Sequence, residues 1–467
     1  MRRRGKGLEP AAPSVSGRER TTKGKGPSIG TKGASDRYWK RYRELMPKYF
    51  WSDATRLASI VVAGAKGSTL IDVDGKEYID LTSQWSTNNL GNVHPEVLAR
   101  TEEALERYGF LIYFMNPHVP MIELAERLLE VRPSENLTRV FLEATGTGAA
   151  EGAVKHAVEA SRRPLVLSFM GQYHGLSIGT INLGSLSASE RRYWEAFQGG
   201  VVHAPYPFPY RRPKGMTEAE FGEWALGFVE DQILRHLASP DRIAGVIFEP
   251  IACEAGIWIP PANFVRGLRK LCDTHGWFFI DDEVEAGLGR TGTMWAVEHF
   301  GVAPDLMSIG KAISGGLLPI AAVLGTERAM GETEVAAGTT FGGHPAACVA
   351  AIATLEIMRR ERIPQRSARL GAKALKRARE WEDLPGVGEV RGLGLCIGVE
   401  LVRDKDSKEP DPKAARDVFF ECVGRGTIPL YNHGDHVLRI QPPLTIEEDL
   451  LTKALETMDE CLRKRVS

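Results

Sequence analysis

The sequence predicts an α/β fold built on a mostly parallel sheet, followed by a smaller α+β unit. From about residue 95 to 330, stretches with helical periodicity alternate with short apolar stretches of strand length. These short stretches are apolar throughout, which is typical of strands covered by helices on both faces. After residue 351 the pattern changes to two strand-like stretches and a C-terminal helix. The alternation therefore predicts parallel or mixed strands in the first part and a separate second unit.

The first 35 residues differ in composition from the rest of the chain. They hold nine Lys or Arg against two Glu and show no apolar period, so they predict a disordered basic tail. The whole chain carries a net charge of −1, which leaves −8 for the remainder. We interpret the tail as a solvated extension, and the alternative is a targeting or nucleic-acid role.

The expected elements follow in order along the chain. A short amphipathic helix is predicted over 36–47, and residues 67–81 predict a β-hairpin that turns at Asp74 and Gly75. Further helices are predicted over 95–109, 122–131, 264–276 and 350–360. Strands are predicted over 163–169, 244–251, 277–283, 305–310, 320–325, 390–402 and 436–446.

We divide the 467 residues into four parts. After the tail, residues 36–94 are predicted to pack with the small domain, residues 95–350 to form the large α/β domain, and residues 351–467 to form the small α+β domain.

Bulk properties exclude several classes of protein. The near-zero net charge argues against a dedicated nucleic-acid binder. No apolar stretch has the length of a membrane-spanning helix, and the N-terminus lacks the apolar region of a secretory signal. The six cysteines are scattered without CxxC spacing, so neither a metal site nor a disulfide framework is predicted. We expect a cytoplasmic protein.

Residues 140–160 predict a phosphate-binding turn. An apolar strand ends, Thr145 to Gly148 form a turn of hydroxyls and glycines, and an alanine-rich helix begins. Backbone amides at a helix N-terminus, with no bulky side chains near them, suit an anion such as phosphate. The alternative is an ordinary strand-to-helix turn with hydroxyl capping.

Two carboxylates, Asp281 and Asp282, end the apolar strand predicted over 277–283. A buried carboxylate without a cationic partner would tend to protonate. The partner is either an internal cation, for which Arg290 is the candidate, or the protonated ring nitrogen of a ligand.

Lys311 follows another predicted strand and is surrounded by small residues, in the sequence SIGKAISGG. A desolvated lysine has a lowered pKa and becomes an amine nucleophile that forms Schiff bases. Pyridoxal 5′-phosphate has a phosphate, a protonatable ring nitrogen and an aldehyde, which match the three groups predicted here.

The order of these motifs resembles class III (ω-type) pyridoxal-phosphate-dependent aminotransferases of fold type I, over about residues 65–450. The family pattern DEVQTGxGRTG, then PD and GK with a glycine-rich tail, here reads DDEVEAGLGRTG…APDLMSIGKAISGG. The resemblance implies a large domain with a seven-stranded, mostly parallel sheet, a smaller α+β domain, and a homodimer or higher oligomer with its active site at the subunit interface.

The resemblance also implies roles for individual residues. Lys311 matches the Schiff-base lysine and proton shuttle, and Asp282 matches the aspartate that pairs with the pyridine nitrogen. Thr340 matches a threonine that reaches the phosphate in the neighbouring subunit. The other positions matched to cofactor contacts are Gly146 and Thr147 at the phosphate, Tyr173 and Val284 on the two ring faces, and His174 and Glu249.

Three residues match the family's substrate site. Glu254 corresponds to an acid that in some members pairs with a carboxylate-binding arginine, and Arg439 matches that arginine. For Arg439 alone the alternative is a surface salt bridge. Trp85 falls where the family lines the substrate pocket, and its alternative is core packing.

The chain departs from the family pattern at four places. The usual phosphate-loop glutamate is Gly148, the usual glutamine after DEV is Glu285, the asparagine of TFGGNP is His344, and Asn92 stands in the GH-x-HP segment. These departures do not change the predicted cofactor. They do weaken the inference of a substrate from the better-known members of the family.

The predicted function is a ping-pong transfer of an amino group from an amino acid or amine to a 2-oxo acid, pyruvate or 2-oxoglutarate. Because the same residues support other reactions, a racemase, epimerase or aminomutase is the alternative. A third possibility is an inactive cofactor-binding protein whose basic tail docks a nucleic acid or partner.

Overall fold

The computed structural model describes residues 33–45, 60–194, 199–334, 338–431 and 435–466. The predicted disordered tail lies outside these ranges except for its last three residues. The first helix, α1 (Ala34–Leu45), begins two residues before its predicted start. Within the described ranges, none of the helices combines the length and apolar character needed to cross a membrane.

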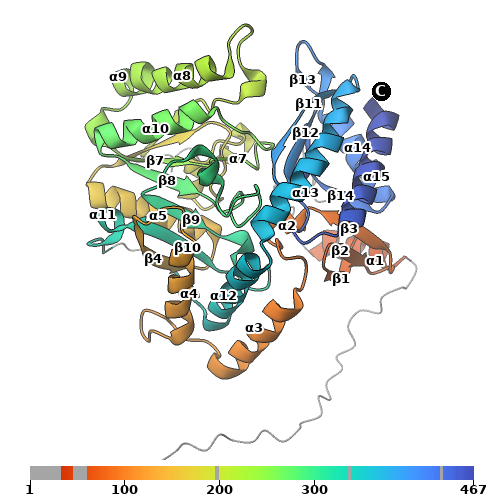
Figure 1. The fold of residues 1–467 in the computed structure, drawn as a ribbon, viewed down its shortest axis with the longest axis horizontal. Helices are drawn as coiled ribbons and strands as arrows, with labels where there is room; N and C mark the ends of the chain where they lie inside the picture. The colour runs from red at the N-terminus through yellow and green to blue at the C-terminus, as the bar shows by residue number, and fades with distance from the viewer. Residues whose placement is uncertain (1–32, 46–59, 195–198, 335–337, 432–434, 467) are drawn as a thin grey trace, which may run out of the picture.

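A seven-stranded sheet forms the centre of the large unit, on the left of Figure 1. Its strands in spatial order are β4 (Leu137–Glu143), β10 (Ala321–Thr326), β9 (Leu306–Ile309), β8 (Phe278–Asp282), β7 (Ile243–Phe248), β5 (Leu165–Phe169) and β6 (Val201–Ala204). The pairs from β9 to β6 are parallel, whereas β10 is antiparallel to both of its neighbours. The seven-stranded, mostly parallel sheet is confirmed.

Helices cover both faces of this sheet, as the continuously apolar strands predict. Helix α5 (Gly146–Ser161) packs its buried alanines against one face, and α10 (Ala262–His275) covers the other beside α8 (Glu218–Phe228). The small side chains of Ala149, Ala153 and Ala157 recur every four residues, so α5 lies close to the strands.

A second sheet, on the right of Figure 1, combines strands from the early and the late parts of the sequence. Its order is β1 (Val62–Lys66), β2 (Thr69–Asp72), β3 (Glu77–Leu81), β14 (Thr427–Tyr431), β15 (Val437–Ile440), β12 (Cys396–Asp404) and β11 (Val387–Leu393), and β13 (Glu409–Pro410) pairs with β12. The predicted hairpin is confirmed as β2–β3, with Gly75 at a φ of 84° in the turn. The parallel pairing of β3 with β14 brings residues 69–81 and 427–440 into one sheet.

The single strand predicted over 390–402 is wrong. The structure has an antiparallel hairpin there, in which Leu393 pairs with Cys396 across a turn at Gly394. Gly394 has a φ of 54°, a left-handed conformation that glycine adopts without steric cost.

The remaining helices fill the surfaces around the two sheets. They are α2 (Ser83–Ser86), α3 (Pro95–Tyr108), α4 (Val119–Glu130), α6 (Thr180–Leu183), α7 (Ala188–Arg191), α9 (Leu234–His236), α11 (Glu327–Met330), α12 (Pro345–Arg360), α13 (Ile363–Ala378), α14 (Pro412–Gly424) and α15 (Glu448–Val466). Helix α12 packs on α3 and α4 and runs across residue 350. The division of the chain at that residue stays a prediction.

Candidate active site

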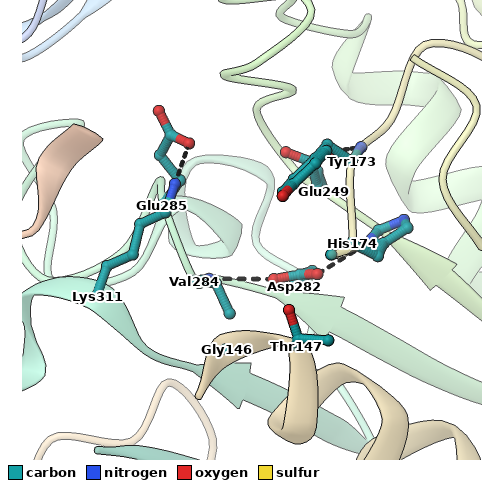
Figure 2. Close-up of a pocket in the computed structure, with 10 residues that line it drawn as sticks. Gly146, Thr147, Tyr173, His174, Glu249, Asp282, Val284, Glu285 and Lys311 are labelled. Atoms are coloured by element: carbon teal, nitrogen blue, oxygen red, sulfur yellow. Dashed lines mark hydrogen bonds and ion pairs between the residues drawn. The ribbon is translucent and has the colours of Figure 1, made fainter. Parts of the chain in front are cut away.

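A cavity of about 150 Å³ opens where parallel strands of the seven-stranded sheet end (Figure 2). In doubly wound sheets, ligands bind at the carboxyl ends of the strands. Eight of the twelve predicted site residues line this cavity, together with Gly175 and Glu285. The residues that line it are Gly146, Thr147, Tyr173, His174, Gly175, Glu249, Asp282, Val284, Glu285 and Lys311.

The N-terminus of α5 forms one wall of the cavity. Thr145 caps the helix, and its hydroxyl accepts a hydrogen bond from the Gly148 amide at 3.0 Å. A Cβ atom on Gly146 would lie 2.6 Å from Cγ1 of Val284, so the backbone approaches this wall too closely for a side chain. Hydroxyl capping and a positive helix end therefore occur together, which suits a phosphate group.

Asp282 is the member of the acidic pair that faces the cavity (Figure 2). Its Oδ2 lies 2.7 Å from Nδ1 of His174, and its Oδ1 accepts a hydrogen bond from the Val284 amide at 3.1 Å. The alternative partner, Arg290, is wrong. Arg290 instead donates hydrogen bonds to the side chains of Ser83 and Asn89 and to the carbonyl oxygens of Leu395 and Pro442. These hydrogen bonds connect the large unit with the unit of the second sheet.

Asp281 does not line the cavity. It is fully buried, and neither of its carboxylate oxygens has a hydrogen-bond partner among the described residues. Burial raises the pKa of Asp281 well above its usual range, and the carboxylates of Glu283 and Asp282 raise it further. The two neighbouring aspartates therefore have different environments, because Asp281 is buried without a hydrogen-bond partner among the described residues and Asp282 pairs with His174.

Tyr173 and Val284 lie on different sides of the cavity (Figure 2). The Tyr173 amide donates to Oε1 of Glu249 at 2.6 Å, and the Gln172 side chain donates to the Glu249 carbonyl at 3.1 Å. Burial raises the pKa of Glu249 well above its usual range, and the nearby Asp282 raises it further. Glu249 thus holds the Tyr173 segment in place through these two hydrogen bonds.

Lys311 projects from the end of β9 into the cavity and forms an ion pair with Glu285. Its φ of 46° is left-handed, a strained conformation for a residue other than glycine and one that occurs often at functional sites. Gly310 precedes it, and a Cβ atom there would lie 3.1 Å from Cα of Gly146. The small residues around Lys311 let two backbones approach each other at the cavity.

The expected low pKa of Lys311 is wrong for this arrangement. Burial does act to lower the pKa, but the carboxylates of Glu285 and Glu254 outweigh it and hold the pKa above its usual value. Sequence reasoning treated Glu285 only as a departure from the family pattern, and it missed the ion pair.

A group of charged residues continues from Lys311 toward β15. Nη2 of Arg439 lies 2.7 Å from Oε2 of Glu254, and its Nη1 lies 3.7 Å from Oε1 of Glu285. The Arg439 side chain is fully buried, so the alternative of a surface salt bridge is wrong. Burial acts to lower the pKa of Arg439, but Glu254, Glu285 and Asp435 outweigh it and raise the pKa.

Trp85 joins the same group rather than the apolar core. Its Nε1 donates to Oε1 of Glu254 at 2.5 Å, and its side chain is half-buried. Residues 83–86 all have φ between 39° and 60°, a left-handed turn that costs roughly 1–2 kcal/mol per residue. The Ser83 hydroxyl bonds to the Gln441 carbonyl at 2.8 Å and accepts from Arg290, which stabilises the turn.

Two further residues lie outside the cavity. Thr340 is exposed and does not line the cavity of its own chain. His344 caps α12, where its Nδ1 accepts a hydrogen bond from the Ala346 amide at 3.2 Å.

Comparisons with known proteins decide the family. The model of the class III aminotransferase family matches residues 51–462. The chain belongs to the class III aminotransferase family.

Individual members show the range of reactions in this family. The chain is 34% identical to an isoleucine 2-epimerase of Lentilactobacillus buchneri, over 92% of this chain and 95% of that one. It is 36% identical to a 5-aminovalerate aminotransferase of Pseudomonas putida, over 86% and 93%. The PLP-bound crystal structure of an amine transaminase from an uncultivated Pseudomonas species superposes with a TM-score of 0.82 at 29% identity, and covers 87% of this chain and 95% of that one.

Pyridoxal 5′-phosphate is the cofactor of this class III aminotransferase. The residues present fit it, because the cavity combines a lysine, a carboxylate held by a histidine, and a helix N-terminus where a Cβ atom would clash. Those groups match the aldehyde, the ring nitrogen and the phosphate.

Proposed function

We propose that this chain transfers an amino group from an amino acid or amine to a 2-oxo acid, such as pyruvate or 2-oxoglutarate. The observation that carries the proposal is the meeting of Lys311, Asp282 and the N-terminus of α5 at one cavity. The family includes aminotransferases with 36% and 35% identity to this chain, which supports the reaction class.

The residues that line the cavity have different roles in the proposed amino transfer. Bound pyridoxal 5′-phosphate supplies an aldehyde that combines with amines and a ring that withdraws electrons. The Lys311 amine would attach to that aldehyde and, when free, would move a proton at the substrate carbon. Asp282 keeps the ring nitrogen protonated, and His174 holds the Asp282 carboxylate in place through the 2.7 Å contact. Tyr173 and Val284 would contact the ring from their different sides of the cavity.

An amino-transfer assay tests this function against its alternative. The purified protein is incubated with single amino acids or amines and with pyruvate or 2-oxoglutarate, and we expect alanine or glutamate to form with ping-pong kinetics. The identity to an isoleucine 2-epimerase favours an epimerase as the second candidate. A single amino acid that changes configuration without any acceptor would support the epimerase and contradict the transfer.

We propose that Arg439 binds the substrate carboxylate and that Glu254 and Trp85 position it. The fully buried guanidinium has Glu254 as its nearest carboxylate, and Trp85 donates a hydrogen bond to the other oxygen of that carboxylate. An incoming carboxylate would replace Glu254 at Arg439, whereas an amine without a carboxylate would leave the pair intact.

We expect Arg439→Gln to lower kcat/KM for amino acids by roughly a hundredfold, because one charge-assisted pair contributes about 1.5–3 kcal/mol. Loss of the guanidinium also leaves the buried carboxylates of Glu254 and Glu285 without this cationic partner. We therefore expect the free energy of unfolding to fall by roughly 3–5 kcal/mol. Steady-state kinetics and urea unfolding measure both effects.

Carboxylate-free amines are the control for this variant, and Arg439→Lys retains the charge if Arg439→Gln does not fold. An equal loss of kcat/KM for amines and amino acids in either variant would contradict the role of Arg439.

We propose a homodimer in which Thr340 reaches the partner's cofactor. An apolar patch, defined by Phe110, Phe114, Met115, Val119, Ile122 and Phe341, has side chains that are 41–67% exposed. The rings of Phe110 and Phe341 lie 4.9 Å apart, and Phe341 directly follows Thr340. A second copy seated on this patch would cover apolar surface and bring Thr340 to another subunit.

We expect Phe114→Glu to weaken the dimer, because it places a charge on exposed apolar surface that the second copy would cover. Light scattering coupled to size-exclusion chromatography measures the mass. Leu237→Glu, which changes a similarly exposed residue (67%) after α9 and away from the patch, is the control. A wild-type protein that runs as a monomer at all concentrations would overturn the proposal.

We propose a cytoplasmic location, with small-molecule substrates and without a nucleic-acid or membrane partner. The six cysteines are buried and free, which supports a reducing compartment.

A further inference from the structure

Glu285 lies between the lysine and the arginine of the site. One carboxylate oxygen pairs with Lys311, and the other accepts a hydrogen bond from Nε2 of Gln441 at 3.2 Å and lies 3.7 Å from Nη1 of Arg439. The Glu285 side chain is 6% exposed, so solvent screens these contacts little. Gln441 also donates to Ser86 at 3.2 Å, which fixes the carboxylate from the side of β15.

Carboxylates outnumber cations in this group. Lys311 and Arg439 are the cations, Glu254 and Glu285 pair with them, and Asp435 also acts on Arg439. Each anion already contacts Arg439 or Lys311, and the Arg439 Nη1 also donates to the Cys253 carbonyl at 3.0 Å. A glutamine in place of Glu285 would remove the carboxylate that pairs with Lys311 and lies beside Arg439.

Resting on the proposed function, we infer that Glu285 is a specificity-determining residue that makes the site discriminate against substrates with a second carboxylate. A substrate with one carboxylate replaces Glu254 at Arg439, so the guanidinium keeps one directly paired carboxylate. A second carboxylate finds no free cation in the group and meets the Glu285 anion, and like charges brought together in a buried site are costly. Monocarboxylate acceptors such as pyruvate are therefore the acceptor class that fits this site.

Binding of unreactive acids tests the inference without turnover. Calorimetry on the cofactor-loaded protein compares glutarate with valerate, two five-carbon acids that differ by one carboxylate. We expect the wild type to bind valerate more tightly, and Glu285→Gln to raise the glutarate-to-valerate affinity ratio by on the order of ten- to a hundredfold. Glu285→Asp keeps the charge and is expected to keep the wild-type preference.

Amino transfer provides a second readout. The ratio of kcat/KM for 2-oxoglutarate to that for pyruvate is expected to rise in Glu285→Gln by about tenfold or more. Glu223→Gln removes an exposed carboxylate on α8 and is the matched control, with both ratios unchanged. Unchanged or lower ratios in Glu285→Gln would overturn the inference.

A third measurement examines Lys311 itself in the cofactor-free protein. The rate at which an acylating reagent labels Lys311, followed by mass spectrometry across pH, reports the pKa of its amine. Because the Glu285 anion stabilises the ammonium form, we expect Glu285→Gln to lower that pKa, so that labelling begins at a lower pH. An unchanged labelling profile would show that the two side chains do not pair.

These readouts separate the two proposals. Absent amino transfer together with the expected binding and labelling shifts would refute the proposed function and leave the role of Glu285 standing. Amino transfer together with unchanged ratios would refute the role of Glu285 alone.

Discussion

Lys311→Ala is expected to abolish amino transfer and the absorbance near 410–430 nm that the bound cofactor's imine gives. Lys311 is the lysine that lines the cavity, and its amine both attaches the cofactor and moves the proton. Loss of a proton-transferring group alone lowers kcat by on the order of 10²–10⁴-fold. Absorbance spectra and single-turnover kinetics measure the two effects.

Lys413→Ala is the control for this variant. Lys413 is 84% exposed on α14 and pairs with Asp417, so its removal leaves the cavity unchanged. An absorbance band in Lys311→Ala equal to that of the wild type would mean that another group holds the cofactor. A wild type that shows no band with added cofactor would contradict the assignment of the whole site.

Most of the sequence-based prediction of the site depended on residues that follow predicted strands. Glu249, Asp282 and Lys311 each follow an apolar stretch, and parallel strands bring their carboxyl ends to one edge, so their meeting follows from the pattern. The antiparallel direction of β10 does not follow from the sequence pattern, because a wholly apolar strand has the same pattern in parallel and in antiparallel pairing. The four-residue edge strand β6 is too short to show a pattern at all.

Contacts between the two units were not predictable in the same way. Glu285 meets Arg439 and Gln441 across about 155 residues of chain, and Arg290 meets Ser83 across 207. Such pairs depend on how two separate sheets pack, which local periodicity does not encode. The sign of the Lys311 pKa shift depends on one of these contacts, which explains why burial alone gave the wrong direction.

Asp282→Asn is expected to produce the second large loss of activity while the protein stays folded. The amide keeps the size of the side chain but removes the charge that would hold the ring nitrogen protonated. At 4 Å and an effective dielectric constant of 20, that charge contributes about 4 kcal/mol, which corresponds to roughly a thousandfold in rate. Stopped-flow measurement of the half-reaction with an amino donor tests this loss.

Asp281→Asn is the matched control, because it makes the same substitution one residue earlier in the same strand. Burial and the neighbouring carboxylates raise the pKa of Asp281 well above its usual range. Asp281 does not line the cavity, so we expect its replacement to change the half-reaction rate little. Equal losses in the two variants would mean that strand β8 itself, rather than the Asp282 charge, limits the rate. A loss confined to Asp282→Asn would locate the effect at the carboxylate that His174 holds in the cavity.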